Sequence, residues 1–276
     1  MKTILVILSL FTLSSALAGF EKIIVQNLDL DYTAPYGAGT VDRVGIGLGL
    51  APENYGIEIN RTDKAFELTS PYVDFTWNNP LKFIFDLEAV VAKKTNAALG
   101  AKTHFIDSEY FMVKPRGRGE YKAHVVKGSC EGTASGSFEM RLLEDCRNKL
   151  DLTIKKIDVP TDFILYKLLE VLPPMPRSDE EFPGDYVIAK INDGDLYLQV
   201  YIKYVFYAGL RTWGHVQFED DRQTLAIRVD QIKFGYLPVT GIVMKKLKEI
   251  ITNPDVKVDP PWIRINIGSL SERTEN

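Results

Sequence analysis

The chain has 276 residues, 45% of them hydrophobic, which is enough to bury a sizeable core as one elongated domain or two small ones. Its 33 Lys and Arg residues against 37 Asp and Glu residues give a formal net charge of −4. Nucleic acids and anionic membranes require a basic face, so this balance argues against either as the main partner.

The first 18 residues predict an export signal. Lys2 supplies a positive start, an apolar run covers Ile4 to Leu13, and Ala16-Leu17-Ala18 has the small-residue spacing of a cleavage site. The apolar run is shorter than the roughly 20 residues that span a bilayer, and no later stretch is apolar enough. We therefore expect an exported protein without a transmembrane segment, periplasmic in a bacterium or secreted in a eukaryote.

The two cysteines, Cys130 and Cys146, predict a disulfide, because an even pair in an exported chain is usually oxidised. Closing this short loop stabilises the fold by roughly 3 kcal/mol on the chain-entropy estimate. The alternative is a redox pair, for which C-x-x-C spacing would be typical. Glycines and alternating apolar residues between the cysteines predict a hairpin that the disulfide closes.

Residues 20–144 predict a series of β-strands. Alternating apolar residues indicate a strand over 23–32 that changes phase before position 28, and short strands at 55–60, 65–69 and 72–77. The stretch 88–99 fits a helix or a strand.

The runs 104–114 and 120–127 predict a further hairpin. At its tip, Lys114, Arg116 and Arg118 are candidates to bind a phosphate headgroup, with a solvated loop as the alternative.

Two stretches 75 positions apart, Lys149–Leu172 and Leu225–Ile251, share one pattern. In each, an alternating strand changes phase once, a proline-containing turn ends it, and apolar residues at helical spacing follow. The phase change predicts a β-bulge. The alternative is that strand–proline–helix is a common sequence in any α+β chain. The matching positions are Leu150/Leu225, Leu152/Ile227, Ile154/Val229, Ile157/Ile232 and Val159/Phe234.

A segment rich in Pro and acidic residues at 173–183 predicts a linker between two halves, 19–172 and 184–270, with a polar tail at 271–276. In the second half, Asn192-Asp193-Gly194 predicts a type I′ hairpin turn. The strand Leu196–Tyr207 that follows is apolar or aromatic on both faces. Such a strand is packed on both sides or lines a second apolar compartment. It is also a candidate to dock an envelope protein.

The catalytic inventory is small. His104, His124 and His215 are not spaced as ligands or as a base with its nucleophile, and we interpret each as a strand surface residue. We expect no catalytic residue, no metal site and no cofactor. A glycosidase needs two acids that face each other across a cleft, so a hydrolase of envelope polymers stays open as an alternative.

The strand, the Gly235-x-Leu237-Pro238 turn and the helix after it, with the earlier unit at Lys149 and the export signal, resemble exported members of the tubular lipid-binding (TULIP) superfamily. The resemblance implies an α+β fold in which a long, strongly curved antiparallel sheet wraps amphipathic helices and lipid lies in the seam. We expect two such helices of short to medium length.

The main expectation for function is therefore an exported carrier that binds a lipid or another apolar ligand in an interior tunnel or groove, for transport or for lipid homeostasis in the envelope. Water leaves such a compartment readily, and few polar anchors are needed. One alternative is that the apolar stripes fill a solid core of a structural or assembly module. The candidate lining residues are Phe163, Leu165, Leu168, Leu169, Ile242, Val243, Leu247 and Ile250.

Overall fold

The computed structural model describes residues 22–46, 55–63, 65–71, 74–78, 86–100, 103–132, 138–160, 164–172, 186–203, 207–221 and 223–266. The predicted export signal, linker and polar tail lie outside these residues. Within them the chain forms one 17-stranded sheet, antiparallel at every pairing, and three helices, which confirms the mainly antiparallel β fold. Strong curvature of the sheet stays a prediction.

The strands are β1 (Lys22–Thr33), β2 (Tyr36–Val41), β3 (Arg43–Ile46), β4 (Tyr55–Arg61), β5 (Ala65–Thr69), β6 (Asp74–Asn78), β7 (Leu87–Gly100), β8 (Thr103–Pro115), β9 (Tyr121–Glu131), β10 (Lys149–Asp158), β11 (Tyr186–Asn192), β12 (Asp195–Lys203), β13 (Tyr207–Phe218), β14 (Thr224–Phe234), β15 (Leu237–Pro238), β16 (Val256–Asp259) and β17 (Trp262–Asn266). The helices are α3 (Phe138–Asn148), α4 (Ile164–Leu169) and α5 (Thr240–Ile250).

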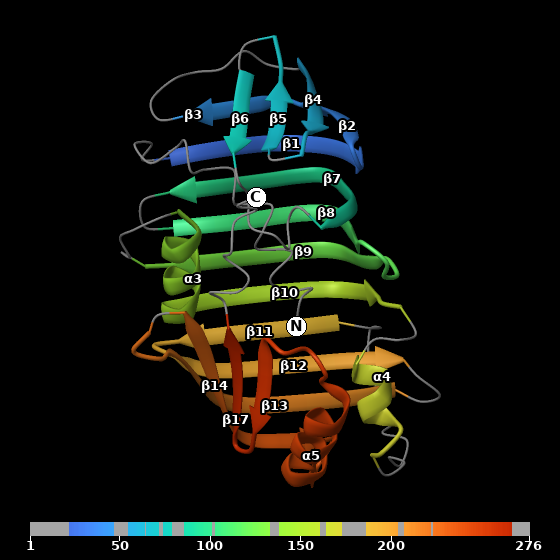
Figure 1. Cartoon of the computed structure of the whole chain (residues 1–276), viewed down its shortest axis with the longest axis vertical. Helices are drawn as coiled ribbons and strands as arrows, with labels where there is room; N and C mark the ends of the chain where they lie inside the picture. Colours follow the sequence, from blue (N-terminus) through green and yellow to red (C-terminus); the bar gives the residue numbers. More distant parts are fainter. Residues whose placement is uncertain are drawn as a thin grey trace.

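The sheet is a long meander. Strands β7 to β14 each pair with the next, β1 joins β7, and β2, β4, β5 and β6 continue beyond β1. At the other end, β17 and then β16 follow β14. Strands β7 to β12 are stacked side by side along the long axis of the molecule, and each strand runs across that axis (Figure 1). Strands β4–β6 at one end and β14 and β17 at the other run steeply to them.

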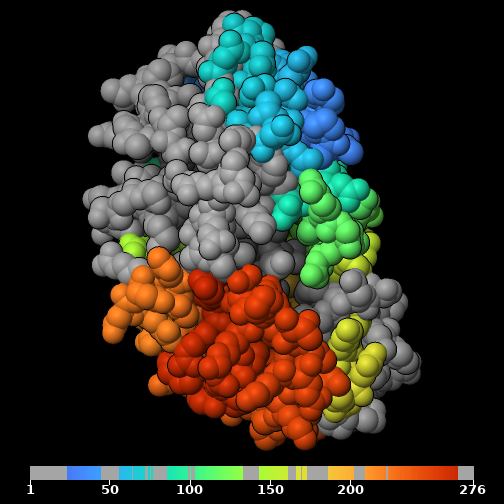
Figure 2. All heavy atoms as spheres, in the orientation of Figure 1, coloured from blue at the N-terminus to red at the C-terminus, as the bar shows by residue number. Residues whose placement is uncertain are grey.

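The sheet is continuous across the position of the predicted linker, because β10 and β11 pair from Lys149↔Asn192 to Ile154↔Val187. The space-filling view shows β4 and β5 at one end of the molecule and the C-terminal strands with α5 at the other (Figure 2).

A change of phase crosses five neighbouring strands of the sheet. On each strand, every second position is apolar or buried until one extra residue interrupts the alternation, after which it resumes. The same face of the sheet is therefore apolar before and after the interruption. Asn27 on β1, Lys94 on β7 and Val125 on β9 take positive φ values of 51°, 46° and 51° along this line. The buried hydroxyls of Thr95 and Ser108 bond to each other there at 2.7 Å. The residues that flank the change are Val25/Leu28, Ala92/Thr95, Ser108/Phe111, Ala123/Val126 and Ile154/Ile157.

The bulge predicted in the second repeated unit is confirmed. Strand β14 pairs Trp213↔Gln231 and then Gly214↔Val229, which leaves Asp230 as the extra residue. In the first unit, β10 keeps an unbroken register with β9, so the bulge predicted in β10 is wrong. The irregularity there lies in β9, at Val125.

The predicted hairpin between the cysteines is wrong, because residues 138–148 form helix α3. Phe138, Leu142 and Cys146 are four residues apart, so the same apolar residues fit a helical face as well as an alternating strand. The chain therefore has three helices in its described part, where the sequence predicted two.

The predicted single strand Leu196–Tyr207 is also wrong. Strand β12 ends at Lys203, β13 begins at Tyr207, and these two residues pair as the chain reverses. No Gly or Pro marks this reversal in the sequence, and apolar residues on both faces hide it. Residues 88–99, left open between helix and strand, belong to β7.

The other predicted strands and hairpins are confirmed. The short strands are β4, β5 and β6, the basic hairpin is β8–β9, and the type I′ turn joins β11 to β12. Asp193 and Gly194 have the positive φ values, 48° and 87°, that this turn requires.

Candidate functional site

One face of the sheet carries a continuous apolar cluster. It runs from Leu30 on β1 through Ile106 on β8 and Ile154 on β10 to Phe234 on β14, and all four side chains are buried. We call this side the inner face and the opposite side the outer face. The inner face spans the whole meander, so it offers apolar surface over a much greater length than either end of the molecule alone.

Helices α4 and α5 contact each other at the C-terminal end of the sheet and share the apolar cluster. Strand β14 holds the start of α5 through two bonds to Ile232. The N–H of Ile232 donates to Thr240 Oγ1 at 2.8 Å, and the N–H of Val239 donates to the Ile232 carbonyl at 2.9 Å. Val243 and Met244 are the buried residues of α5, so its inward side is fixed against β14 and α4.

The structure brings part of the predicted lining together at this place. Leu168 of α4 and Val243 of α5 are buried in the cluster, and Leu247 and Ile250 pack against it. Ile242 is 49% exposed and does not face the cluster. Phe163 and the side chains of Leu165 and Leu169 lie outside the described residues, and whether any of these residues binds a ligand stays a prediction.

Helix α3 is fixed to the inner face by the predicted disulfide and by a buried His–Asp hydrogen bond. Cys130 and Cys146 form the disulfide, which confirms the pairing. Beside it, His104 Nε2 lies 2.9 Å from Asp145 Oδ2, and the two side chains are 3% and 0% exposed. The interpretation of His104 as a strand surface residue is therefore wrong.

Sequence reasoning missed this His–Asp pair because 41 positions separate its two residues. The pair can orient α3, but a side chain this buried has no access to a substrate. His124 and His215 contact Tyr110 and Asp195 respectively, at a ring separation of 4.9 Å and an N–O distance of 3.2 Å.

The outer face of β11, β12 and β13 carries a packed aromatic cluster. The rings of Tyr186 and Tyr201 stack at 4.5 Å, and those of Tyr197 and Trp213 lie 5.5 Å apart. Gly209 leaves room for the Tyr201 ring, because a Cβ there would lie 2.6 Å from it. Burial raises the pKa of the Tyr186 hydroxyl, and the neighbouring Tyr201 adds to the effect.

Hydrogen bonds connect the same cluster. Tyr197 donates to Gln199 Oε1 at 2.6 Å, and Gln199 Nε2 donates to the Tyr186 oxygen at 3.1 Å. Lys233 lies 5.5 Å above the Trp213 ring. Within β12, Leu198 and Val200 pack against the cluster of the inner face, while Tyr197 and Tyr201 belong to the aromatic cluster of the outer face.

The positive charge at the turn of the β8–β9 hairpin is less concentrated than the sequence suggests. Lys114 forms an ion pair with Glu88 at 3.0 Å, while Arg116 and Arg118 are exposed. The headgroup site at these three residues stays a prediction.

Two acids face a shallow concavity of about 570 Å³ on β1, β2 and β4. Asp31 and Glu58 lie opposite Ala38 from either side. Both side chains are exposed, whereas a general acid is usually held in a partly buried, apolar setting.

Within the residues that the structure describes, no three His, Cys, Asp or Glu side chains are grouped so that they could hold a metal ion. No helix in the described ranges is long and apolar enough to cross a membrane. Comparison with protein-family models, curated proteins and solved structures finds no match, and the resemblance to the tubular lipid-binding superfamily stays a prediction.

Proposed function

We propose that this protein is exported and binds a lipid or another elongated apolar molecule against the inner face of its sheet, where α5 packs on β14 and α4 contacts α5. The observation that carries the proposal is the unbroken apolar cluster from Leu30 to Phe234. A face of this length matches an acyl chain better than a compact ligand. On this reading the sheet curves around its guest, as the resemblance implies.

Small side chains recur along the inner face. Ala92 on β7, Ala123 on β9 and Ala189 on β11 are all buried in the apolar cluster. Small residues leave depth between the larger ones, and an elongated guest could occupy that depth. Each methylene that leaves water gains about 0.8 kcal/mol, against which the lost freedom of the ligand must be set.

Native mass spectrometry of the protein purified from its producing cells tests the proposal. We expect the wild-type protein to carry an apolar adduct and the Val243→Trp variant to lose it, because the larger ring would occupy space between α5, α4 and β14. Val171→Trp is the matched control, since Val171 is exposed just beyond α4. Circular dichroism and a urea midpoint show whether each variant is folded.

A fluorescent fatty acid titrated into the delipidated protein gives a second readout. Saturable binding that Val243→Trp weakens and Val171→Trp leaves unchanged supports the proposal. A wild-type protein that is free of adduct and does not bind the probe contradicts it.

The aromatic cluster on the outer face favours one second candidate, an assembly module that docks an envelope protein through Tyr186, Tyr197, Tyr201 and Trp213. Tyr and Trp are enriched at protein interfaces. Protein that is free of adduct, together with an envelope complex that Trp213→Ala dissociates, would favour this candidate over the carrier.

A further inference from the structure

Exposed apolar side chains are concentrated at the start of α5. Six large hydrophobic side chains are exposed in the described residues, and three of them lie within the seven positions 236–242. Tyr236 is 90% exposed, Leu237 45% and Ile242 49%. Scattered exposed hydrophobic residues are ordinary, but a group of this kind marks an interaction surface.

The backbone around these residues is held in place. Strand β15 pairs with β14 through Lys233↔Pro238 and Phe234↔Leu237. Arg211 Nη2 donates to the Gly235 carbonyl at 3.1 Å, and the Gly235 N–H donates to the Gly209 carbonyl at 3.2 Å. The exposure of Tyr236 and Leu237 is therefore built into a fixed hairpin.

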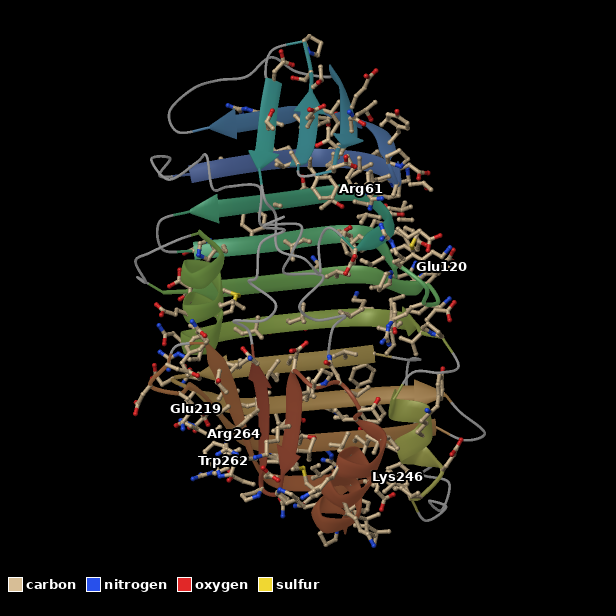
Figure 3. All side chains as sticks on the ribbon, in the orientation of Figure 1. Arg61, Glu120, Glu219, Lys246, Trp262 and Arg264 are labelled. Atoms are coloured by element: carbon tan, nitrogen blue, oxygen red, sulfur yellow. A yellow bond between two sulfur atoms is a disulfide. The ribbon has the colours of Figure 1, made fainter. Side chains whose placement is uncertain are left out.

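Lysines lie beside this apolar group on α5, although Lys248 forms an ion pair with Asp259 at 3.4 Å. The stretch 231–248 contains four lysines and no Asp or Glu, in a chain whose net charge is −4. Lys245 and Lys246 follow Ile242 by three and four residues, which places them beside it on the helix surface. Lys245 is exposed and forms no ion pair with the carboxylates of the described residues, while Lys246 lies 3.7 Å from Glu249. Figure 3 shows Lys246 at the end of the molecule where α5 and α4 lie.

We propose that Tyr236, Leu237, Ile242, Lys245 and Lys246, together called the tip, dock onto the surface of an anionic phospholipid bilayer. Aliphatic side chains enter the interface, a tyrosine ring suits the headgroup level, and lysine stems extend along apolar surface while their ammonium groups meet phosphates. Charges separated by more than about 8 Å are largely screened at physiological salt, so the local lysines outweigh the acidic total.

This inference rests on the proposed lipid binding for its purpose. Helix α5 supplies both the exposed Ile242 of the tip and the buried Val243 of the proposed ligand site. Docking at the tip would therefore place that site next to the bilayer with which a lipid is exchanged.

Co-sedimentation with vesicles of phosphatidylcholine, with and without phosphatidylglycerol, tests the tip. We expect the full chain to bind the anionic vesicles and to bind pure phosphatidylcholine weakly. The double variant Tyr236→Ser/Ile242→Ser should lose at least about tenfold in partitioning, and Lys245→Glu/Lys246→Glu should lose the preference for anionic lipid. Tyr36→Ser is the matched control, because Tyr36 is 67% exposed on β2, at the other end of the sheet.

Three results would overturn the proposal: no binding of the wild-type chain to anionic vesicles, an equal loss with Tyr36→Ser, or tip variants that change self-association in sedimentation velocity and leave vesicle binding intact. Native mass spectrometry of the same samples separates the two proposals. An adduct without vesicle binding contradicts the tip alone, and vesicle binding by protein that carries no adduct and does not bind the fatty-acid probe contradicts the carrier alone.

Discussion

The two repeated units, Lys149–Leu172 and Leu225–Ile251, begin from one sequence pattern and form different structures. Strand β10 lies within the meander between β9 and β11, whereas β14 pairs with β13 on one side and with β15 and β17 on the other. The helix that follows has six residues in the first unit and eleven in the second. The shared pattern specifies a strand, a phase change and a helix, and the neighbouring strands determine the form that each takes.

The phase change shows this most clearly. Strands β1, β7, β8 and β9 all change phase along the line that reaches β10, so the five strands shift together and the β9–β10 pairing needs no extra residue. On β13 the inner-face residues Leu210, Gly214 and Val216 are buried and stay in one phase. Strand β14 changes phase beside a neighbour that does not, and it therefore inserts Asp230.

The largest expected difference between the units lies at their last matching position, Val159 and Phe234. Phe234 is fully buried in the cluster, whereas Val159 is half-buried. We expect Phe234→Ala to lower the free energy of unfolding by about 3–5 kcal/mol, because it leaves a cavity between β14 and the helices. Val159→Ala should lower it by about 1 kcal/mol.

Urea denaturation monitored by circular dichroism measures the free energy of unfolding of both variants. The slope of that free energy against urea concentration should be unchanged. Similar losses at the two positions would contradict the different surroundings given to β10 and β14. A Phe234→Ala variant that fails to fold can be replaced by Phe234→Leu, for which the same order is expected with a smaller difference.

The second difference lies in what precedes each unit. Helix α3 and the Cys130–Cys146 disulfide fix the chain directly before β10, and β14 has no such attachment in the described residues. Replacing both cysteines with Ala should destabilise the protein by about 3 kcal/mol, since the disulfide closes a loop with a sequence separation of 16 residues. Urea unfolding of the wild-type chain with and without a reductant compares the same two states, with the disulfide and without it. Equal urea midpoints would contradict the expected contribution of the disulfide to stability.

Local sequence signals predicted a large part of this fold. Alternating apolar residues marked most strands, Asp193 and Gly194 marked a turn that only a positive φ allows, and the cysteine pair was read correctly. Where two structures satisfy one pattern, the sequence was ambiguous. Phe138 and Cys146 fit a strand or a helix, and only the contacts of α3 with β9, β10 and β11 decide between them.

For the candidate site, helical spacing identified the apolar side of α5 but not which of its residues are buried. Val243 and Met244 are both buried and Ile242 before them is exposed, because successive helical residues point in different directions and Ile242 lies just outside the buried side. The His104–Asp145 pair depends on the docking of α3 across 41 positions, for which no local pattern exists. The aromatic cluster on the outer face likewise forms only when β11, β12 and β13 are in register.

The smallest expected difference concerns the anchor of the second helix. Thr240 Oγ1 accepts the N–H of Ile232 at 2.8 Å, and the matching position 75 residues earlier is Leu165, which has no side-chain oxygen. Thr240→Val keeps the shape and leaves that N–H without its partner, so we expect a loss of about 1 kcal/mol, while Thr240→Ser should retain most of the stability.

Hydrogen exchange at the Ile232 amide measures this bond separately from global unfolding. The amide should exchange faster in Thr240→Val than in Thr240→Ser, because only the valine variant removes its acceptor. Unchanged exchange and an unchanged urea midpoint would mean that packing of Val243 and Met244 alone holds α5 on β14. In that case the two units would attach their helices by the same apolar contacts, and the difference between them would be confined to the strands.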